Sequence, residues 1–231
     1  MRCAKHSLYG FAVPFFLPKG AQAFLSHLQT TRIYNGKTMP KLVLSSRAIQ
    51  VINKSIDLFH HRGFHTVGVD RIVKECEITK ATFYNFFLSK ARFIEICLIV
   101  QKERLKEKVV SIVEYSQDIS AADKLKQLYF LHTDVEGMFY LLFKAMFETK
   151  LTYPKAYITA VRYRTWLLNE IYSQLIKLKT DATFQDAKLF LYMVEGTIIQ
   201  LLSSDGAIDR EKMLDCFLNA NKADNAFEYK P

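Results

Sequence analysis

Glycine and proline are scarce in this chain, whose 231 residues include only 8 Gly and 5 Pro. No segment rich in Val, Ile and Thr alternates apolar and polar residues with period two, so a sandwich or barrel of short strands is excluded. Half of the residues are hydrophobic, and they recur three and four positions apart, as helices with one buried face require. The sequence therefore predicts an all-α fold with a substantial core.

Metal-binding and catalytic patterns are also missing. The four cysteines, at positions 3, 76, 97 and 216, form no C-x-x-C pair, which suits a reducing cytoplasm. His61 and His65 stand four apart, but Gly63 between them interrupts a helical metal face. We find no Gly-rich phosphate loop, no Ser-His-Asp order and no paired carboxylates. We expect no metal, no cofactor and no enzymatic activity.

Acidic residues are absent from the first forty positions, which carry a net charge of +5. Arg2 and Lys5 precede the apolar stretch 8–17, an outline that resembles a secretory signal, but Pro14 interrupts it. The stretch is too short and broken to span a membrane. Helical periodicity begins only after Pro40, so we interpret residues 1–40 as an extension, disordered or not native, with Met39 as the natural start. We expect a cytoplasmic protein.

Positive charge is confined to the N-terminal half. Residues 41–105 carry a further +5, whereas residues 106–231 carry −1, within a total of +9. This asymmetry favours a small domain that faces a polyanion and a larger one that faces something else. An ordinary basic surface is the alternative.

Two helices are expected before residue 78. Ser45 or Ser46 can cap the first, whose apolar stripe ends at Phe59 and whose end is set by Gly63. The second is short, with Val69, Ile72, Val73 and Cys76 on one face. In that position Cys76 acts as a small hydrophobe, with a redox switch as the alternative.

The third helix carries residue types that suit a DNA groove. Ile78 fills the corner, Thr79 caps the helix, and Phe83 and Phe87 pack inward. The other side presents Lys80, Ala81, Thr82, Tyr84 and Asn85. Lysine and tyrosine reach phosphates, Thr and Asn bond base edges, and alanine permits close approach. Ser89 then opens a fourth helix with Lys90 as a second phosphate contact.

These residues resemble the signature of the TetR family of bacterial regulators. The matching positions are Gly63-Phe64, Val69-x-x-Ile72, Ile78 to Tyr84, and Phe87-x-Ser89-Lys90. The resemblance is specific over residues 45–105. It implies a three-helix DNA-binding domain with a helix-turn-helix at about 68–87, followed by a helical effector-binding and dimerisation domain at 106–231. Typical members are homodimeric repressors that a small molecule releases from palindromic operators.

The chain departs from the family pattern at three places. The family usually carries two hydroxyl residues before its second helix, where this chain has Val67 and Gly68, with Thr66 one place early. Glu77 replaces the usual turn glycine, which predicts mild backbone strain. Phe86 replaces a frequent His or Tyr. The residues expected to contact DNA are Thr66, Gly68, Thr79, Lys80, Ala81, Thr82, Tyr84, Asn85 and Lys90.

The sequence predicts only helices in the C-terminal half. One is expected from Lys90 to about Tyr115, then others at about 121–132, 135–148, 154–179, 182–204 and 209–220. By analogy with the family, the helices at 154–179 and 182–204 are the candidates for a dimer bundle, although an internal core explains their apolar stripes almost as well. Their members are Val161, Leu168, Ile171, Leu175 and Leu178, then Phe190, Leu191, Val194, Ile198 and Leu201.

An aromatic group in this half is the candidate effector pocket. Its members are Phe139, Tyr140, Phe143, Phe147 and Trp166, and ordinary core packing is the alternative. Without a fixed cluster of charges, the group favours an apolar or amphipathic ligand. The sequence thus predicts a dimeric repressor that binds double-stranded operator DNA and is released by a small molecule. The alternative is control by a protein partner, or activation, without any ligand.

Overall fold

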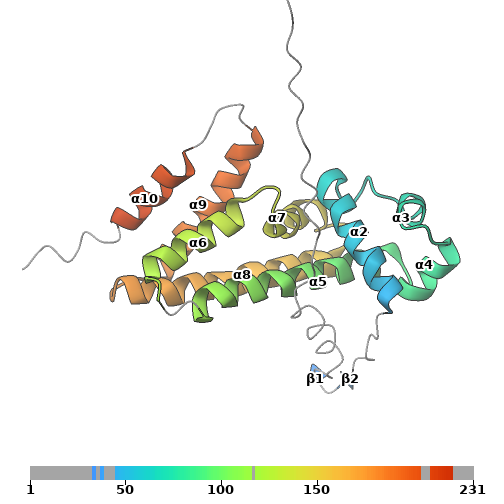
Figure 1. Ribbon diagram of the computed structural model, residues 1–231, viewed down its shortest axis with the longest axis horizontal. Coiled ribbons are helices and arrows are strands. Elements are labelled where there is room, and N and C mark those ends of the chain that lie inside the picture. Colours follow the sequence, from blue (N-terminus) through green and yellow to red (C-terminus); the bar gives the residue numbers. More distant parts are fainter. Residues whose placement is uncertain (1–32, 35–36, 39–44, 116–117, 204–208, 221–231) are drawn as a thin grey trace, which may run out of the picture. The chain divides into compact units, whose positions relative to one another are not determined.

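The structure, a computed structural model, describes residues 33–34, 37–38, 45–115, 118–203 and 209–220. The chain divides into two units, residues 1–46 and 47–231. In the first, strands β1 (Ile33–Tyr34) and β2 (Lys37–Thr38) pair antiparallel, with Ile33 opposite Thr38. The expectations for the rest of residues 1–40 lie outside the described residues. In the second unit every described element is helical, which confirms the all-α class (Figure 1).

Three helices form the N-terminal domain of the second unit. They are α2 (Ser46–Arg62), α3 (Val69–Glu75) and α4 (Lys80–Phe87). Helix α2 ends where the sequence predicted, because Gly63 adopts φ +81 and its N–H donates to Phe59 O at 2.9 Å. The buried side of α2 includes Ile52, Ile56 and Phe59, so the predicted stripe is a core face.

Helix α5 (Lys90–Val110) continues into a π-helical turn, η1 (Ser111–Tyr115), and leads to the C-terminal domain. That domain contains α6 (Ala121–Thr133), α7 (Met138–Glu148), α8 (Pro154–Leu178), α9 (Phe184–Ser203) and α10 (Arg210–Ala220). Helix α8 contacts α5, α6, α7 and α9, and therefore lies at the centre of the packing. Figure 1 shows α2, α3 and α4 grouped near one end of α5.

The apolar stripes of α8 and α9 pack within the chain. Leu168, Ile171 and Leu175 are buried on α8, as are Phe190, Leu191, Val194 and Ile198 on α9. Arg164 of α8 and Glu195 of α9 also form a bidentate ion pair, with N···O distances of 2.5 and 2.9 Å. The core explanation of these stripes is therefore correct for most of their members. Other residues of α9 face outward.

Among the residues that the structure describes, no helix combines the length and the apolarity that crossing a bilayer requires.

Candidate nucleic-acid interface

The turn between α3 and α4 is tight and internally bonded. Thr79 caps α4 as predicted, since its Oγ1 accepts from the Thr82 N–H at 3.1 Å. Glu77 adopts φ 53, which confirms the strain expected from a non-glycine residue at this position. The carbonyl oxygens of Glu77 and Glu75 accept from Arg47 Nη2 at 2.9 Å and Lys54 Nζ at 3.2 Å. Two cations of α2 thus satisfy the carbonyl end of α3.

An aromatic cluster fixes the orientation of α4. The ring centroids of Phe83 and Phe87 lie 5.3 Å apart, and both rings pack on Phe93 of α5, at 5.0 and 4.4 Å. All three side chains are fully buried, as is Ile72 of α3. Ile78 is half-buried in the corner. Since one face of α4 is committed to this cluster, the opposite face must point to solvent.

That opposite face carries the predicted DNA contacts. Lys80, Ala81 and Asn85 are exposed, and Tyr84 keeps 45% of its surface accessible. Thr82 is half-buried, and its hydroxyl lies 2.9 Å from that of Thr79. The structure therefore brings five of the nine predicted contacts, those on α4, onto one helix.

Lys80 has an ionic partner of its own. Its Nζ lies 2.5 Å from Asp70 Oδ1 of α3, and both side chains are well exposed. The hydrogen bond to Asp70, together with the negative charge, raises the pKa of Lys80. For Lys80 to contact a DNA phosphate, its ion pair with Asp70 would have to break and be replaced by one with the phosphate.

The other predicted contacts lie around the start of α3 and of α5. Thr66 is exposed, and Gly68 is the N-cap of α3 without a side-chain hydrogen bond. Lys90, at the start of α5, donates to His65 O at 3.5 Å, and its Nζ lies 5.6 Å from the centroid of the Tyr153 ring. The Lys90 side chain is thus directed at the α2–α3 connection.

Cys76 shows the burial expected of a small hydrophobe. It is 5% exposed, and its Sγ lies 3.9 Å from Val51 O. Burial raises the pKa of the Cys76 thiol, which keeps it protonated and weakly reactive.

A contact between the two domains was not predicted from the sequence. Glu148, at the end of α7, accepts from the Phe64 N–H at 2.8 Å, and its own carbonyl accepts from His65 Nε2 at 2.6 Å. Lys144, one turn earlier on α7, donates to His60 O at 2.9 Å. A Cβ at Gly63 would lie 2.8 Å from Glu148 Oε2, so a side chain there would displace this carboxylate. Helix α7 therefore binds the backbone that follows α2.

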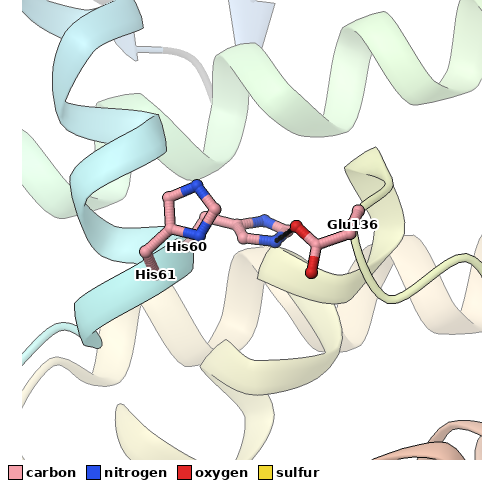
Figure 2. A group of neighbouring side chains, drawn as sticks. All are labelled: His60, His61 and Glu136. Carbon is pink, nitrogen blue, oxygen red and sulfur yellow. Dashed lines mark ion pairs between the residues drawn. The ribbon is translucent and has the colours of Figure 1, made fainter. Parts of the chain in front are cut away.

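A group of three potential metal ligands lies at the same domain boundary. Figure 2 shows His60 and His61 of α2 with Glu136, which precedes α7. His65, which the sequence pairs with His61 by spacing, instead stacks on Tyr153 at 5.7 Å. No sequence pattern connects Glu136 with the histidines, because only the packing of α7 against α2 brings them together.

The residues predicted for an effector pocket separate into two sets. Phe139, Phe143 and Phe147 form a row on α7, with centroid distances of 6.3 and 5.0 Å, and Phe139 reaches Trp166 through Tyr163. Phe139 and Phe143 are buried, whereas Phe147 is 68% exposed. Tyr140 points the other way and meets His60 at 5.2 Å. The aromatic group therefore serves both the core and the domain boundary.

Comparison with known proteins identifies the N-terminal domain. Residues 51–95 match the family of bacterial regulatory proteins known as the tetR family. Over 55 residues the chain is 31% identical to the HTH-type transcriptional regulator UidR of Escherichia coli strain K12. That match covers 24% of this chain and 28% of the length of UidR.

Solved structures extend the similarity to the C-terminal domain. SCO4454, a TetR-family regulator from Streptomyces coelicolor, superposes with a TM-score of 0.63 at 19% identity, over 77% of this chain and 87% of its own. A putative transcriptional regulator from Saccharomonospora viridis, in complex with choline, gives a TM-score of 0.65 at 18% identity, over 75% and 94%. At this identity the likeness shows the fold.

The relatives are transcriptional regulators, which argues against the enzyme class. Residues 51–95 of this chain are thus similar to the tetR family of bacterial regulatory proteins, and the chain has a fold that TetR-family regulators share.

Proposed function

We propose that the chain binds double-stranded operator DNA through the exposed face of α4 and represses transcription as a homodimer. The single observation that carries this proposal is the arrangement of α4. Phe83 and Phe87 anchor one face in the core, while Lys80, Tyr84 and Asn85 stand exposed on the other. A helix of this kind fits the major groove, with asparagine suited to adenine and lysine or tyrosine suited to phosphates.

A second copy of the chain supplies the second reading helix. Helix α9 exposes Leu189, Tyr192, Ile199 and Leu202, each more than half accessible. Gly196 lies among them, and a Cβ added there would meet nothing within 4 Å of the same chain. An apolar face with a glycine permits close approach of another helix. Two α4 helices about 34–36 Å apart would then read a palindrome.

Release by a small apolar or amphipathic ligand completes the proposal. The aromatic row on α7 leads from the C-terminal core to Glu148, which holds the backbone of Phe64. A ligand that prefers one position of α7 would shift the equilibrium between two placements of the DNA-binding domain. A regulator with the same fold is known in complex with choline, which supports a small-molecule effector. Control by a protein partner, or activation, is the alternative.

Selection of bound duplexes from fragmented genomic DNA tests the operator assignment. We expect enrichment of one palindromic sequence whose half-sites are separated by about one helical turn. Enrichment of unrelated fragments, with affinity that depends on length alone, would contradict the proposal. A thermal-shift screen of the same protein against small molecules then distinguishes ligand control from control by a partner protein.

A further inference from the structure

Three side chains with metal-ligating atoms converge where α2 meets the segment before α7. One nitrogen or oxygen from each of His60, His61 and Glu136 lies within 4.8 Å of the others. His60 Nε2 and Glu136 Oε2 are 3.7 Å apart. Figure 2 shows both imidazoles at the end of α2 and the carboxylate approaching from the other domain.

The donor set is that of a zinc-class ion. Two imidazoles and one carboxylate, completed by water, suit Zn²⁺ and its neighbours, whereas Mg²⁺ and Ca²⁺ prefer oxygen ligands. Ligands at about 2.0–2.1 Å from a tetrahedral ion lie about 3.3 Å from one another. The three groups must therefore move closer together. His61 is exposed and the Glu136 side chain is 77% exposed, so both can rotate freely.

His60 is held in place before any ion arrives. Its side chain is only 12% exposed, and its ring packs edge-on against Tyr140 at 5.2 Å. Burial lowers the pKa of His60, and the nearby His61 lowers it further, although Glu136 and a hydrogen bond with the Val135 backbone raise it. The neutral imidazole is thus favoured near pH 7, and this is the form that binds metals.

The backbone that carries Glu136 is equally constrained. The Glu136 N–H donates to Asp134 Oδ1 at 3.1 Å, and the Gly137 N–H donates to Asp134 O at 3.0 Å. A Cβ at Gly137 would lie 2.9 Å from that carbonyl oxygen, so this turn requires glycine. In this segment, binding therefore orders the Glu136 side chain and leaves the backbone unchanged.

Solvent and nearby charge are compatible with an ion. His61 lines a surface cavity of about 450 Å³ between α2 and α3, which gives water and metal access. Lys144 is the cation from α7 that faces His60. It is already bonded to His60 O at 2.9 Å and paired with Glu148 at 3.8 Å, and its charge helps to lower the pKa of His60, which favours the neutral imidazole.

We propose that His60, His61 and Glu136 bind one divalent transition-metal ion of the zinc class. Such an ion joins the end of α2 to the start of α7 and so cross-links the two domains. The site lies beside the contact of Glu148 with Phe64, and it reinforces the same arrangement. This inference is independent of whether the chain binds DNA.

Metal titration of the full chain after treatment with a chelator tests the site. We expect Zn²⁺ to bind at one ion per chain by calorimetry, Co²⁺ to give visible absorption bands of a low-symmetry site, and Mg²⁺ to give no heat. His61→Asn and Glu136→Gln should each weaken Zn²⁺ binding at least about tenfold. Glu211→Gln, which removes an exposed carboxylate from α10, is the matched control and should bind like the parent chain.

Thermal unfolding provides a second measurement. Excess Zn²⁺ should raise the Tm of the parent chain and of Glu211→Gln, because the ion binds the folded state, and should leave the Tm of both ligand variants unchanged. His61 and Glu136 are exposed, so these variants are expected to fold. Unchanged Zn²⁺ affinity in both variants would overturn the proposal, since the ion would then bind elsewhere, for example at Cys3, His6 or His27.

Discussion

Two residues with positive φ flank helix α4, Glu77 before it at φ 53 and Leu88 after it at φ 66. Both are exposed, so neither is compensated by burial of its side chain. In the left-handed region a residue with a Cβ is less stable than glycine by about 1–2 kcal/mol. The turn between α3 and α4 is therefore stabilised by its neighbours, above all by Arg47, which bonds the Glu77 carbonyl.

Replacing Glu77 with glycine should stabilise the protein. We expect Glu77→Gly to raise the free energy of unfolding by about 0.5–1 kcal/mol, because the relief of strain exceeds the entropy that glycine adds to the unfolded chain. Urea denaturation followed by circular dichroism measures this change. The control is Glu75→Gly, two residues earlier within α3, which should lower stability by about 1 kcal/mol. Destabilisation by both variants would contradict the account.

His132 is a buried polar residue within the C-terminal core. Its Nδ1 lies 2.6 Å from Leu128 O and its Nε2 lies 2.7 Å from the Tyr163 hydroxyl. A carbonyl only accepts, so Nδ1 donates and Nε2 accepts from Tyr163. This network requires neutral histidine, and burial lowers the pKa of His132 to about 4. Protonation would place a charge where the structure offers no counterion.

Stability should therefore fall as the pH falls from 6.5 toward 4. The unfolded chain takes up the proton near pH 6.5 and the folded chain only near pH 4, so acid favours unfolding within this window. Between pH 7 and pH 5 the loss from His132 is about 2 kcal/mol. Urea titrations of the parent chain and of His132→Gln, compared at both pH values, isolate this contribution. Equal pH dependence in the two proteins would disprove it.

At the scale of elements, we expect the ion pair between α3 and α4 to limit DNA affinity. Asp70 of α3 holds Lys80 of α4 and brings negative charge to the face that we assign to DNA. Asp70→Asn should raise operator affinity several-fold and make it more sensitive to salt, because Lys80 is then free for a phosphate. Fluorescence anisotropy at several salt concentrations measures both effects. Glu211→Gln on α10 also removes one negative charge and should change neither the operator affinity nor its salt dependence. Weaker operator binding by Asp70→Asn would contradict this prediction.

Periodicity predicted most elements, because each helix buries a regular stripe. The last turn of α2 and the first turns of α4 and α8 were also predictable. Gly63 is a strong signal for a helix C-terminus, and Thr79 and Pro154 are strong signals for a helix N-terminus. The positive φ of Leu88 could not be predicted, because leucine does not favour that conformation. The π-helical turn Ser111–Tyr115 could not be predicted either, because the apolar pattern continues through it.

At the scale of the whole molecule, we propose that the outward face of α9 forms the dimer interface. We expect Leu189→Glu to convert a dimer into a monomer in size-exclusion chromatography with light scattering, because a charge there would be buried against the second copy. Leu151→Glu is the control, since Leu151 is 92% exposed in the turn before α8 and lies outside this face. A dimer that survives Leu189→Glu, or is lost in Leu151→Glu, would place the interface elsewhere.

Contacts between the two domains could not be predicted from the sequence. Glu148 meets Phe64, and Glu136 meets His60, only because α7 packs beside the end of α2. Neither glutamate stands in a recognisable motif. By contrast, the residues of α4 lie within one short motif, so their shared face followed from helical spacing alone. Local sequence thus predicted that these residues share one exposed face of α4, whereas the contact between the domains depends on tertiary packing.

Operator affinity of variants on α4 tests the central claim most directly. With a duplex obtained by selection, Tyr84→Phe and Lys80→Ala should each weaken binding several-fold, with the fold unchanged by circular dichroism. Lys80→Ala should also reduce the salt dependence of binding, because it removes a cation. Leu151→Glu, far from α4 in sequence and exposed, should bind like the parent chain. Unchanged affinity in both α4 variants would contradict the assignment of this helix as the reading head.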